Sequence, residues 1–283
     1  MADINQMRME QGGTAPSARP EQTRSEAPLP PLPPDAMIIM PVRNFVLFPG
    51  IVMPVTAGRQ RSVAAAQQAV REQRPVGILM QRDAQVEEPT PLDMHRMGTI
   101  ANIVRYVTAP DGSQHLICQG EQRFQVLEFL SGWPFFVARV LRIPESDNKS
   151  PEIEARMMHL RSQAVEALEL LPQAPQELIA AIQGVDSASG LADLSAAYMD
   201  LKPEERQEVL ETIDVPARME KVSRFLGQRL EVMRLSAEIG KQTRAALDER
   251  QREVLLREQM AAIQKQLGEG EEGKAAELGE IEK

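Results

Sequence analysis

Short runs of apolar and β-branched residues recur along the first half of the chain and predict a β-rich domain over residues 37–145. Residues 109–113, Ala-Pro-Asp-Gly-Ser, are typical of a tight turn, so the strands on either side should pair as an antiparallel hairpin. Val63, Ala66 and Val70 instead have helical spacing and predict one helix over Arg59–Gln73 that packs on the sheet. The expected strands are Met37–Val42, Ile51–Thr56, Val76–Gln81, Thr99–Thr108, His115–Gln119, Phe124–Leu130 and Phe135–Ile143.

The second half of the chain changes to helical spacing after a polar linker at residues 145–151. Apolar residues on one stripe, with prolines or turn residues between the segments, predict a helical subdomain over residues 151–215. Its expected helices are Glu152–Leu171, Pro175–Val185, Gly190–Met199 and Pro203–Ile213.

After Pro216 no proline occurs up to Leu267, and residues 216–267, as one helix, would extend over roughly 78 Å. Apolar residues recur every seven positions from Leu226, but companion positions such as Arg229 and Arg250 are polar, which argues against a free-standing coiled coil. One long helix and two or more segments with an exposed middle both fit this pattern. Residues 268–283 are rich in Gly and Glu, and we expect them to be a truncated end.

Composition and charge narrow the class of protein. Residues 1–36 hold seven of the 21 prolines and no aromatic residue, which predicts a disordered, extended tail. The net charge of −9, from 32 basic and 41 acidic residues, makes nucleic acid an unlikely leading partner. A single cysteine, Cys118, and the lack of a signal segment or an apolar run long enough for a membrane span predict a cytoplasmic protein in a reducing compartment.

A search for catalytic chemistry finds only weak candidates. The run Gly268–Ala275 resembles a phosphate-binding P-loop, but it lacks the final Ser or Thr, contains three glutamates and follows no buried strand. His95, His115 and His159 each stand apart from other metal-ligand residue types, and Cys118 lies within an apolar strand without an identified base. We therefore expect no catalytic residue, metal site or cofactor site in this chain, and a binding role instead.

The apolar segment Phe45–Pro54 is the candidate for binding. Two prolines and a glycine interrupt it, so it cannot form one regular central strand, and some of its side chains should lie at a sheet edge or in a loop. Exposed apolar loops often mark interaction sites. The alternative is that Phe45, Leu47 and Ile51 close the end of the barrel.

Several motifs in a fixed order resemble the Lon ATP-dependent protease family. Met40–Gly50 followed by Pro54–Arg59 is similar to the opening of its N-terminal domain, although Val42 stands where the family usually has Leu. Leu256–Glu269 is similar to the family's long helix before the ATPase domain, and the whole resemblance covers about residues 37–269. Further landmarks are Gln81–Asp83, Gly98–Ala101, Pro110–Gly112 and Gly120–Arg123.

The resemblance implies an α+β protein: a mostly antiparallel, PUA-like β pseudo-barrel with one helix, then an all-α subdomain and a long connecting helix. It also implies that this region recognises unfolded or degron-bearing proteins and supports assembly of a hexamer in the full-length parent. The parent's AAA+ ATPase motifs, which use ATP and Mg, and its Ser-Lys dyad lie further along the family's sequence and are absent here. The family acts in protein quality control and the stress response.

Three functions follow as hypotheses. The leading one is the substrate-recognition and assembly region of an ATP-dependent Lon serine protease that degrades misfolded and regulatory proteins. The alternative is a stand-alone Lon-domain adaptor, against which the long helix argues. The third is a PUA-like RNA-binding module. The net negative charge of the chain argues against it, although residues 218–265 carry eleven basic and seven acidic residues. The residues expected to contact substrate are Val42, Phe48, Met53, Pro54 and Ile117.

Overall fold

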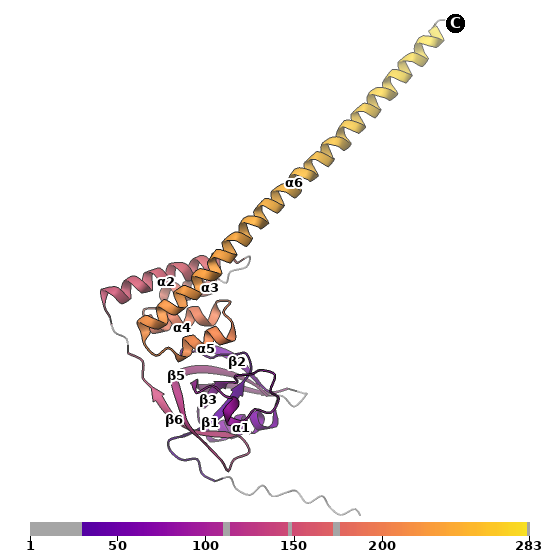
Figure 1. The fold of residues 1–283 in the computed structure, drawn as a ribbon. Coiled ribbons are helices and arrows are strands. Elements are labelled where there is room, and N and C mark those ends of the chain that lie inside the picture. The colour runs from indigo at the N-terminus through magenta and orange to yellow at the C-terminus, as the bar shows by residue number, and fades with distance from the viewer. Residues whose placement is uncertain (1–29, 110–113, 147–148, 172–175, 282–283) are drawn as a thin grey trace, which may run out of the picture. The chain divides into compact units, whose positions relative to one another are not determined.

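The computed structural model describes residues 30–109, 114–146, 149–171 and 176–281, with side chains described up to Ile263 in the last range. Six strands form the N-terminal domain in the described part of the chain (Figure 1). Helix α1 (Gln60–Glu72) and the short 3₁₀ helix η1 (Pro91–Asp93) lie between them in the sequence. The strands are β1 (Ala36–Val42), β2 (Val52–Ala57), β3 (Val76–Met80), β4 (Met97–Thr108), β5 (Gln114–Leu130) and β6 (Phe136–Ile143).

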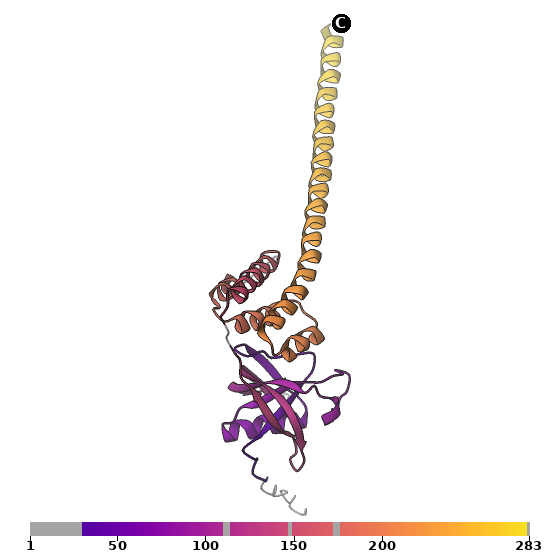
Figure 2. The same cartoon turned by 60° about the vertical axis from the view of Figure 1, so that its left-hand side comes forward.

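The strands are ordered β2-β5-β4-β3-β1-β6, and an additional pairing joins β5 to β6. This pairing closes β5, β4, β3, β1 and β6 into a ring, and Figure 2 shows these strands curling around a common core. Only β1 and β3 pair in parallel among these strands; the other pairings are antiparallel. The expected mostly antiparallel pseudo-barrel is therefore confirmed.

Strand β5 differs from the sequence prediction, which expected two strands at His115–Gln119 and Phe124–Leu130. The intervening residues do not break the strand, because they stay paired with β4: Gly120 lies opposite Ala101 and Gln122 opposite Ile100. A register shift between Ile100 and Ala101 accommodates the polar interruption as an irregularity of the ladder. The result is one strand of 17 residues that pairs with β2, β4 and β6.

Two local predictions in this domain are confirmed. Strands β4 and β5 form the expected hairpin, with Thr108 opposite Gln114, while the turn residues 110–113 lie outside the described residues. The predicted helix is present as α1, but it buries Ala65, Ala66 and Ala69 and leaves Val70 exposed, so its buried face is turned from the one expected. The predicted tail is described only from residue 30, where Leu32 already packs against the core and β1 begins at Ala36.

The helical subdomain matches the predicted segments within a few residues. Its elements are α2 (Pro151–Glu169), α3 (Gln176–Gly184), α4 (Ala188–Tyr198) and α5 (Pro203–Glu211). Helix α2 begins where the Ser150 hydroxyl accepts a hydrogen bond from the Ile153 amide at 3.2 Å, with Pro151 in the first turn. Residues 172–175, including the proline expected to end α2 and the one expected to begin α3, lie outside the described residues.

Helix α6 (Val215–Ile281) is one continuous helix of 67 residues, so the alternative of two or more segments is wrong. Its first turns bury Val215, Met219, Val222, Leu226 and Leu230, at the three- and four-residue spacing of one helix face, and pack against α2 and α4. From residue 234 to residue 263 every side chain is exposed. The expected exposed middle is therefore present, although the helix is continuous.

The P-loop-like run, Gly268–Ala275, lies within α6. A phosphate-binding loop needs non-helical backbone whose N–H groups point at the ligand, so this run does not fit a nucleotide. No helix in the described part of the chain has an apolar stretch long enough to cross a bilayer.

Buried charges join the barrel to the helices. Arg123 of β5 and Arg218 of α6 are almost fully buried, and both contact Asp193 of α4 and Glu145. Burial lowers the pKa of Arg218, and the nearby Asp193 only partly opposes this effect. For Arg123 burial also acts to lower the pKa, but Asp193 and Glu145 outweigh it and hold the pKa above the ordinary value.

Candidate functional site

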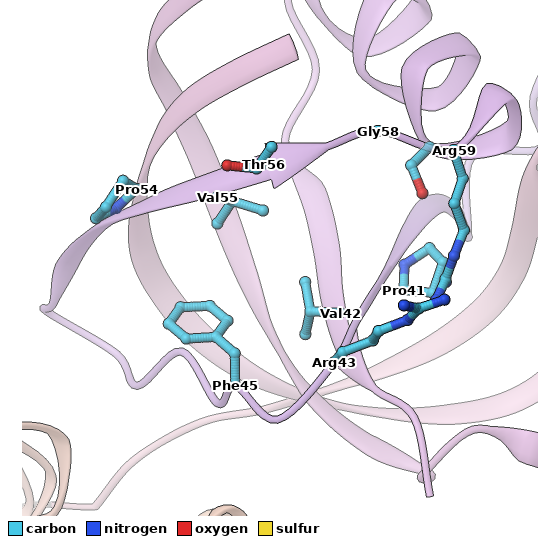
Figure 3. Close-up of a pocket in the computed structure, with 10 residues that line it drawn as sticks. Pro41, Val42, Arg43, Phe45, Pro54, Val55, Thr56, Gly58 and Arg59 are labelled. Carbon is cyan, nitrogen blue, oxygen red and sulfur yellow. The ribbon is translucent and has the colours of Figure 1, made fainter. Parts of the chain in front are cut away.

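A cavity of about 440 Å³ opens beside the C-terminal end of β1, between this strand and β2 (Figure 3). Strands β1 and β2 are not neighbours in the sheet, so no backbone ladder closes the space between them. We call this cavity the β1–β2 groove. Its lining residues are Pro41, Val42, Arg43, Phe45, Pro54, Val55, Thr56, Gly58, Arg59 and Ser62.

The loop after β1 shapes the groove. Asn44 adopts a left-handed conformation, with φ of 49°, which Asn tolerates better than most residues. This turn separates Arg43 from Phe45, so the two residues line different parts of the groove (Figure 3). The loop is then anchored on β5, where the Gly50 amide donates to the Gly120 carbonyl at 2.9 Å and the Gly120 amide donates to the Ile51 carbonyl at 2.8 Å.

One half of the groove is apolar. Figure 3 shows Val42, Phe45 and Val55 pointing into the space between the loop and β2, with Pro54 on the same strand. Val42 and Val55 are buried and belong to the barrel core, whereas Phe45 is half-buried and Pro54 is exposed. An apolar side chain placed here would contact Phe45 and Pro54 without disturbing the core.

The other half of the groove is basic. Figure 3 shows the Arg43 and Arg59 side chains converging next to Pro41. The Nη2 atom of Arg59 is buried and has no hydrogen-bond partner among the described residues. Burial and the neighbouring Arg43 charge lower the pKa of Arg59, opposed by the more weakly acting Glu88 and Glu87. In the described part of the chain, no ion pair joins either guanidinium to a carboxylate.

The residues predicted to contact substrate divide between the groove, its neighbourhood and the core. Val42 and Pro54 line the β1–β2 groove. Ile117 lies opposite Pro54 in the β2–β5 ladder and is half-buried. Met53 is also half-buried, lies opposite Cys118 and packs against the core.

Phe48 was expected in the contact surface, and the structure corrects this prediction because its side chain is 0% exposed. The hydrogen bonds of Gly50 and Gly120, and a 2.5 Å hydrogen bond from the Thr99 hydroxyl to the Leu47 carbonyl, hold the loop against the sheet. Phe48 is thereby buried in the barrel core. Leu47 and Ile51 are buried with it, as the alternative of a closed barrel end predicted.

Sequence reasoning gave no binding role to Arg43 or Arg59. It left Phe45 open between a binding role, as part of the segment Phe45–Pro54, and closure of the barrel end. A signal for the basic half was present in the sequence. Residues 36–71 contain four arginines and no Asp or Glu, although the whole chain is acidic. Such a locally basic segment in an acidic protein indicates a place where an anionic group is recognised.

The histidines and the cysteine are not among the residues that line the β1–β2 groove in the described part of the chain. Within the residues that the structure describes, no three His, Cys, Asp or Glu side chains are grouped as metal ligands. His95 lies 3.2 Å from Glu211, and His115 lies 3.2 Å from the Thr56 hydroxyl. Burial raises the pKa of the Cys118 thiol to about 11, which keeps it protonated and unreactive at neutral pH.

Comparison with known proteins identifies the family. The model of the ATP-dependent protease La (LON) substrate-binding domain matches residues 36–228, which include the barrel, the helical subdomain and the start of α6. The chain therefore belongs to the family of Lon substrate-binding domains. It is 63% identical over 247 residues to Lon protease of Methylocella silvestris and 58% identical over 248 residues to Lon protease of Phenylobacterium zucineum.

These alignments cover 87% of this chain, but the chain spans only about 30% of the length of either relative. Among solved structures, the N-terminal domain of a Mycobacterium avium complex Lon protease has the same fold, with a TM-score of 0.58. That alignment covers 68% of this chain and 98% of the solved chain at 22% sequence identity.

Proposed function

We propose that this chain captures protein substrates for an ATP-dependent Lon protease by binding their exposed apolar segments in the β1–β2 groove. The observation that carries the proposal is the apolar half of this groove, on a domain of the Lon substrate-binding family. Phe45 and Pro54 provide apolar surface that is accessible from solvent, while Val42 and Val55 form a rigid base that belongs to the core. Such a surface selects unfolded proteins, because folded proteins bury most of their large apolar side chains.

The groove should bind weakly and with little sequence selectivity. Each apolar side chain buried in it contributes on the order of 1.5–3 kcal/mol before entropic costs, which corresponds to micromolar or weaker affinity for a single segment. A cytoplasmic hexamer of the complete protease would retain an unfolded substrate for longer, because it presents several grooves to the same chain. ATP-driven unfolding and cleavage would belong to the remaining part of such a protease.

The test is binding of the 283-residue protein to a thermally unfolded model protein, compared with the same protein in its folded form. We expect selective binding of the unfolded form, and a loss of about tenfold in affinity for Phe45→Ser. The control is Leu141→Ser, which changes another apolar side chain of the barrel, on β6, that is 52% exposed and does not line the groove.

Equal binding of the folded and unfolded forms, or equal effects of Phe45→Ser and Leu141→Ser, would contradict the proposal. Circular dichroism of both variants separates a lost contact from a lost fold. Binding that depends steeply on salt and is displaced by RNA would instead favour a nucleic-acid contact.

A further inference from the structure

The basic half of the β1–β2 groove is not explained by apolar capture alone. Arg43 and Arg59 converge at one end of the groove (Figure 3), and among the described residues neither forms an ion pair. The charges of two converging guanidinium groups repel each other, and Arg59 retains a buried hydrogen-bond donor without an acceptor among the described residues. Such an arrangement is stabilised when an anion is placed between the two groups.

We infer that the groove binds the C-terminal residue of a protein substrate, with its α-carboxylate between Arg43 and Arg59 and its apolar side chain against Phe45 and Pro54. This inference rests on the proposed function and specifies which part of a substrate the groove prefers. A terminal residue carries a carboxylate and a side chain on the same Cα, which matches a single cavity lined by both basic and apolar residues.

Three observations on Arg59 support a carboxylate ligand. Its Nη2 atom is buried without a hydrogen-bond partner among the described residues, which is costly unless a ligand provides an acceptor. Its planar guanidinium can bind both oxygens of a carboxylate. Arg59 also precedes α1, whose first turn holds no acidic residue, so the partial positive charge at this helix end adds to the same field.

The apolar half of the groove favours a peptide over other anions. A free phosphate or a nucleic-acid backbone would use the two arginines but leave Phe45 and Pro54 without a partner. Glu87 and Glu88 act on Arg59 from outside the ion-pair distance and reduce the local positive potential. This moderate potential suits a single carboxylate better than a polyanion.

The experiment compares two fluorescein-labelled hexapeptides, Ser-Gly-Ser-Gly-Ala-Leu, that end in a free carboxylate or in an amide, by fluorescence anisotropy with the 283-residue protein. We expect the free acid to bind about tenfold more tightly than the amide. In the Arg43→Gln and Arg59→Gln variants, the ratio of the affinity for the free acid to that for the amide should fall to about two or less. Arg71→Gln, an exposed arginine in the last turn of α1, should retain it.

Because the acid-to-amide ratio is measured within one protein sample, a variant that misfolds loses binding of both peptides rather than the preference. Equal affinity for both peptides in the wild-type protein would overturn the inference, as would failure to bind either one. An amidated peptide with an internal Asp before Leu that binds as tightly as the free acid would overturn the α-carboxylate assignment. Displacement of the free acid by oligouridine would overturn the choice of a peptide ligand.

Failure of this inference can be distinguished from failure of the proposed function. If unfolded protein binds selectively and Phe45→Ser weakens it, while the acid and amide peptides bind equally, the apolar capture stands and only the carboxylate preference fails. If neither unfolded protein nor either peptide binds, both proposals fail.

Discussion

Arg123 of β5 donates hydrogen bonds from both terminal nitrogens to the two carboxylate oxygens of Asp193 in α4, at distances of 2.6 and 2.8 Å. The two side chains are 0% and 1% exposed, so this bidentate pair lies in the interior, where the barrel meets the helical subdomain. Arg123 also donates from Nε to the Leu210 carbonyl at 3.0 Å, at the end of α5. A single arginine of the barrel therefore contacts two helices of the subdomain.

Removing one partner of this pair should destabilise the protein strongly. We expect Asp193→Asn or Arg123→Met alone to lower the free energy of unfolding by about 3–5 kcal/mol, because each leaves one uncompensated charge in the buried cluster of Arg123, Arg218, Asp193 and Glu145. The double variant Arg123→Met with Asp193→Leu should recover a large part of this loss. Urea denaturation measures all three variants.

The control for this experiment is Arg139→Met. Arg139 forms ion pairs with Asp35 and Glu128, but all three side chains are about half exposed. Its replacement should change the free energy of unfolding by less than about 1 kcal/mol. Equal effects at Arg123 and Arg139 would contradict a special role for the buried pair.

Alanine variants of Phe45 and Phe48 should separate an effect on substrate binding from an effect on stability. Phe48→Ala removes a fully buried ring and should cost about 3–5 kcal/mol of unfolding free energy, while Phe45→Ala, at a half-buried position, should cost markedly less. Only Phe45→Ala should weaken binding of unfolded protein under conditions in which both variants remain folded. Thermal denaturation measures the stability of both variants, and the binding assay measures their affinity for unfolded protein. Weaker binding by Phe48→Ala but not by Phe45→Ala would contradict the β1–β2 groove as the binding site.

Gly120 should tolerate no side chain. A Cβ atom at this position would lie 2.2 Å from the Phe48 carbonyl oxygen, which is backbone and cannot move aside easily. We expect Gly120→Ala to destabilise the protein by roughly 1–3 kcal/mol. Gly58→Ala is the matched control, because nothing lies within 4 Å of its Cβ position, and it should stay within about 0.5 kcal/mol of the wild type.

Cys118 should resist alkylation in the folded protein. Burial raises its pKa to about 11, and its side chain is 0% exposed, so little thiolate forms at pH 8 and iodoacetamide cannot reach it. Mass spectrometry should show no adduct on the native protein and one adduct after unfolding in urea. Rapid labelling of the native protein would show that β5 opens readily from its pairing with β2 and β4.

Glu211 should contribute to the acid sensitivity of the fold. A hydrogen bond with His95 lowers the pKa of Glu211, an effect that burial opposes and the Gln207 side chain reinforces. Because the folded-state pKa lies below the unfolded value of about 4.3, this stabilisation is present above that pH and is lost as the pH falls through the folded-state pKa. Denaturation between pH 6 and pH 3 should therefore show a weaker pH dependence for Glu211→Gln than for the wild type.

Much of the fold was predictable because the signals are local. Strand and helix bounds agree within a few residues at most positions, since alternation, helical spacing, prolines and turn residues act within one element. The β4–β5 hairpin followed from the turn residues between its strands. The resemblance to Lon proteins rested on short motifs in order, and these too are readable from the sequence alone.

What the tertiary structure decided depends on contacts between distant segments. Phe45 and Phe48 have the same side chain in the same loop, and only the docking of that loop on Gly120 makes one half-exposed and the other fully buried. Arg123 and Asp193 are 70 positions apart, so no local pattern pairs them. Arg43 and Arg59 likewise converge only because the barrel brings the end of β1 next to the start of α1. Local patterning selects the elements, whereas burial and charge pairing arise from their packing.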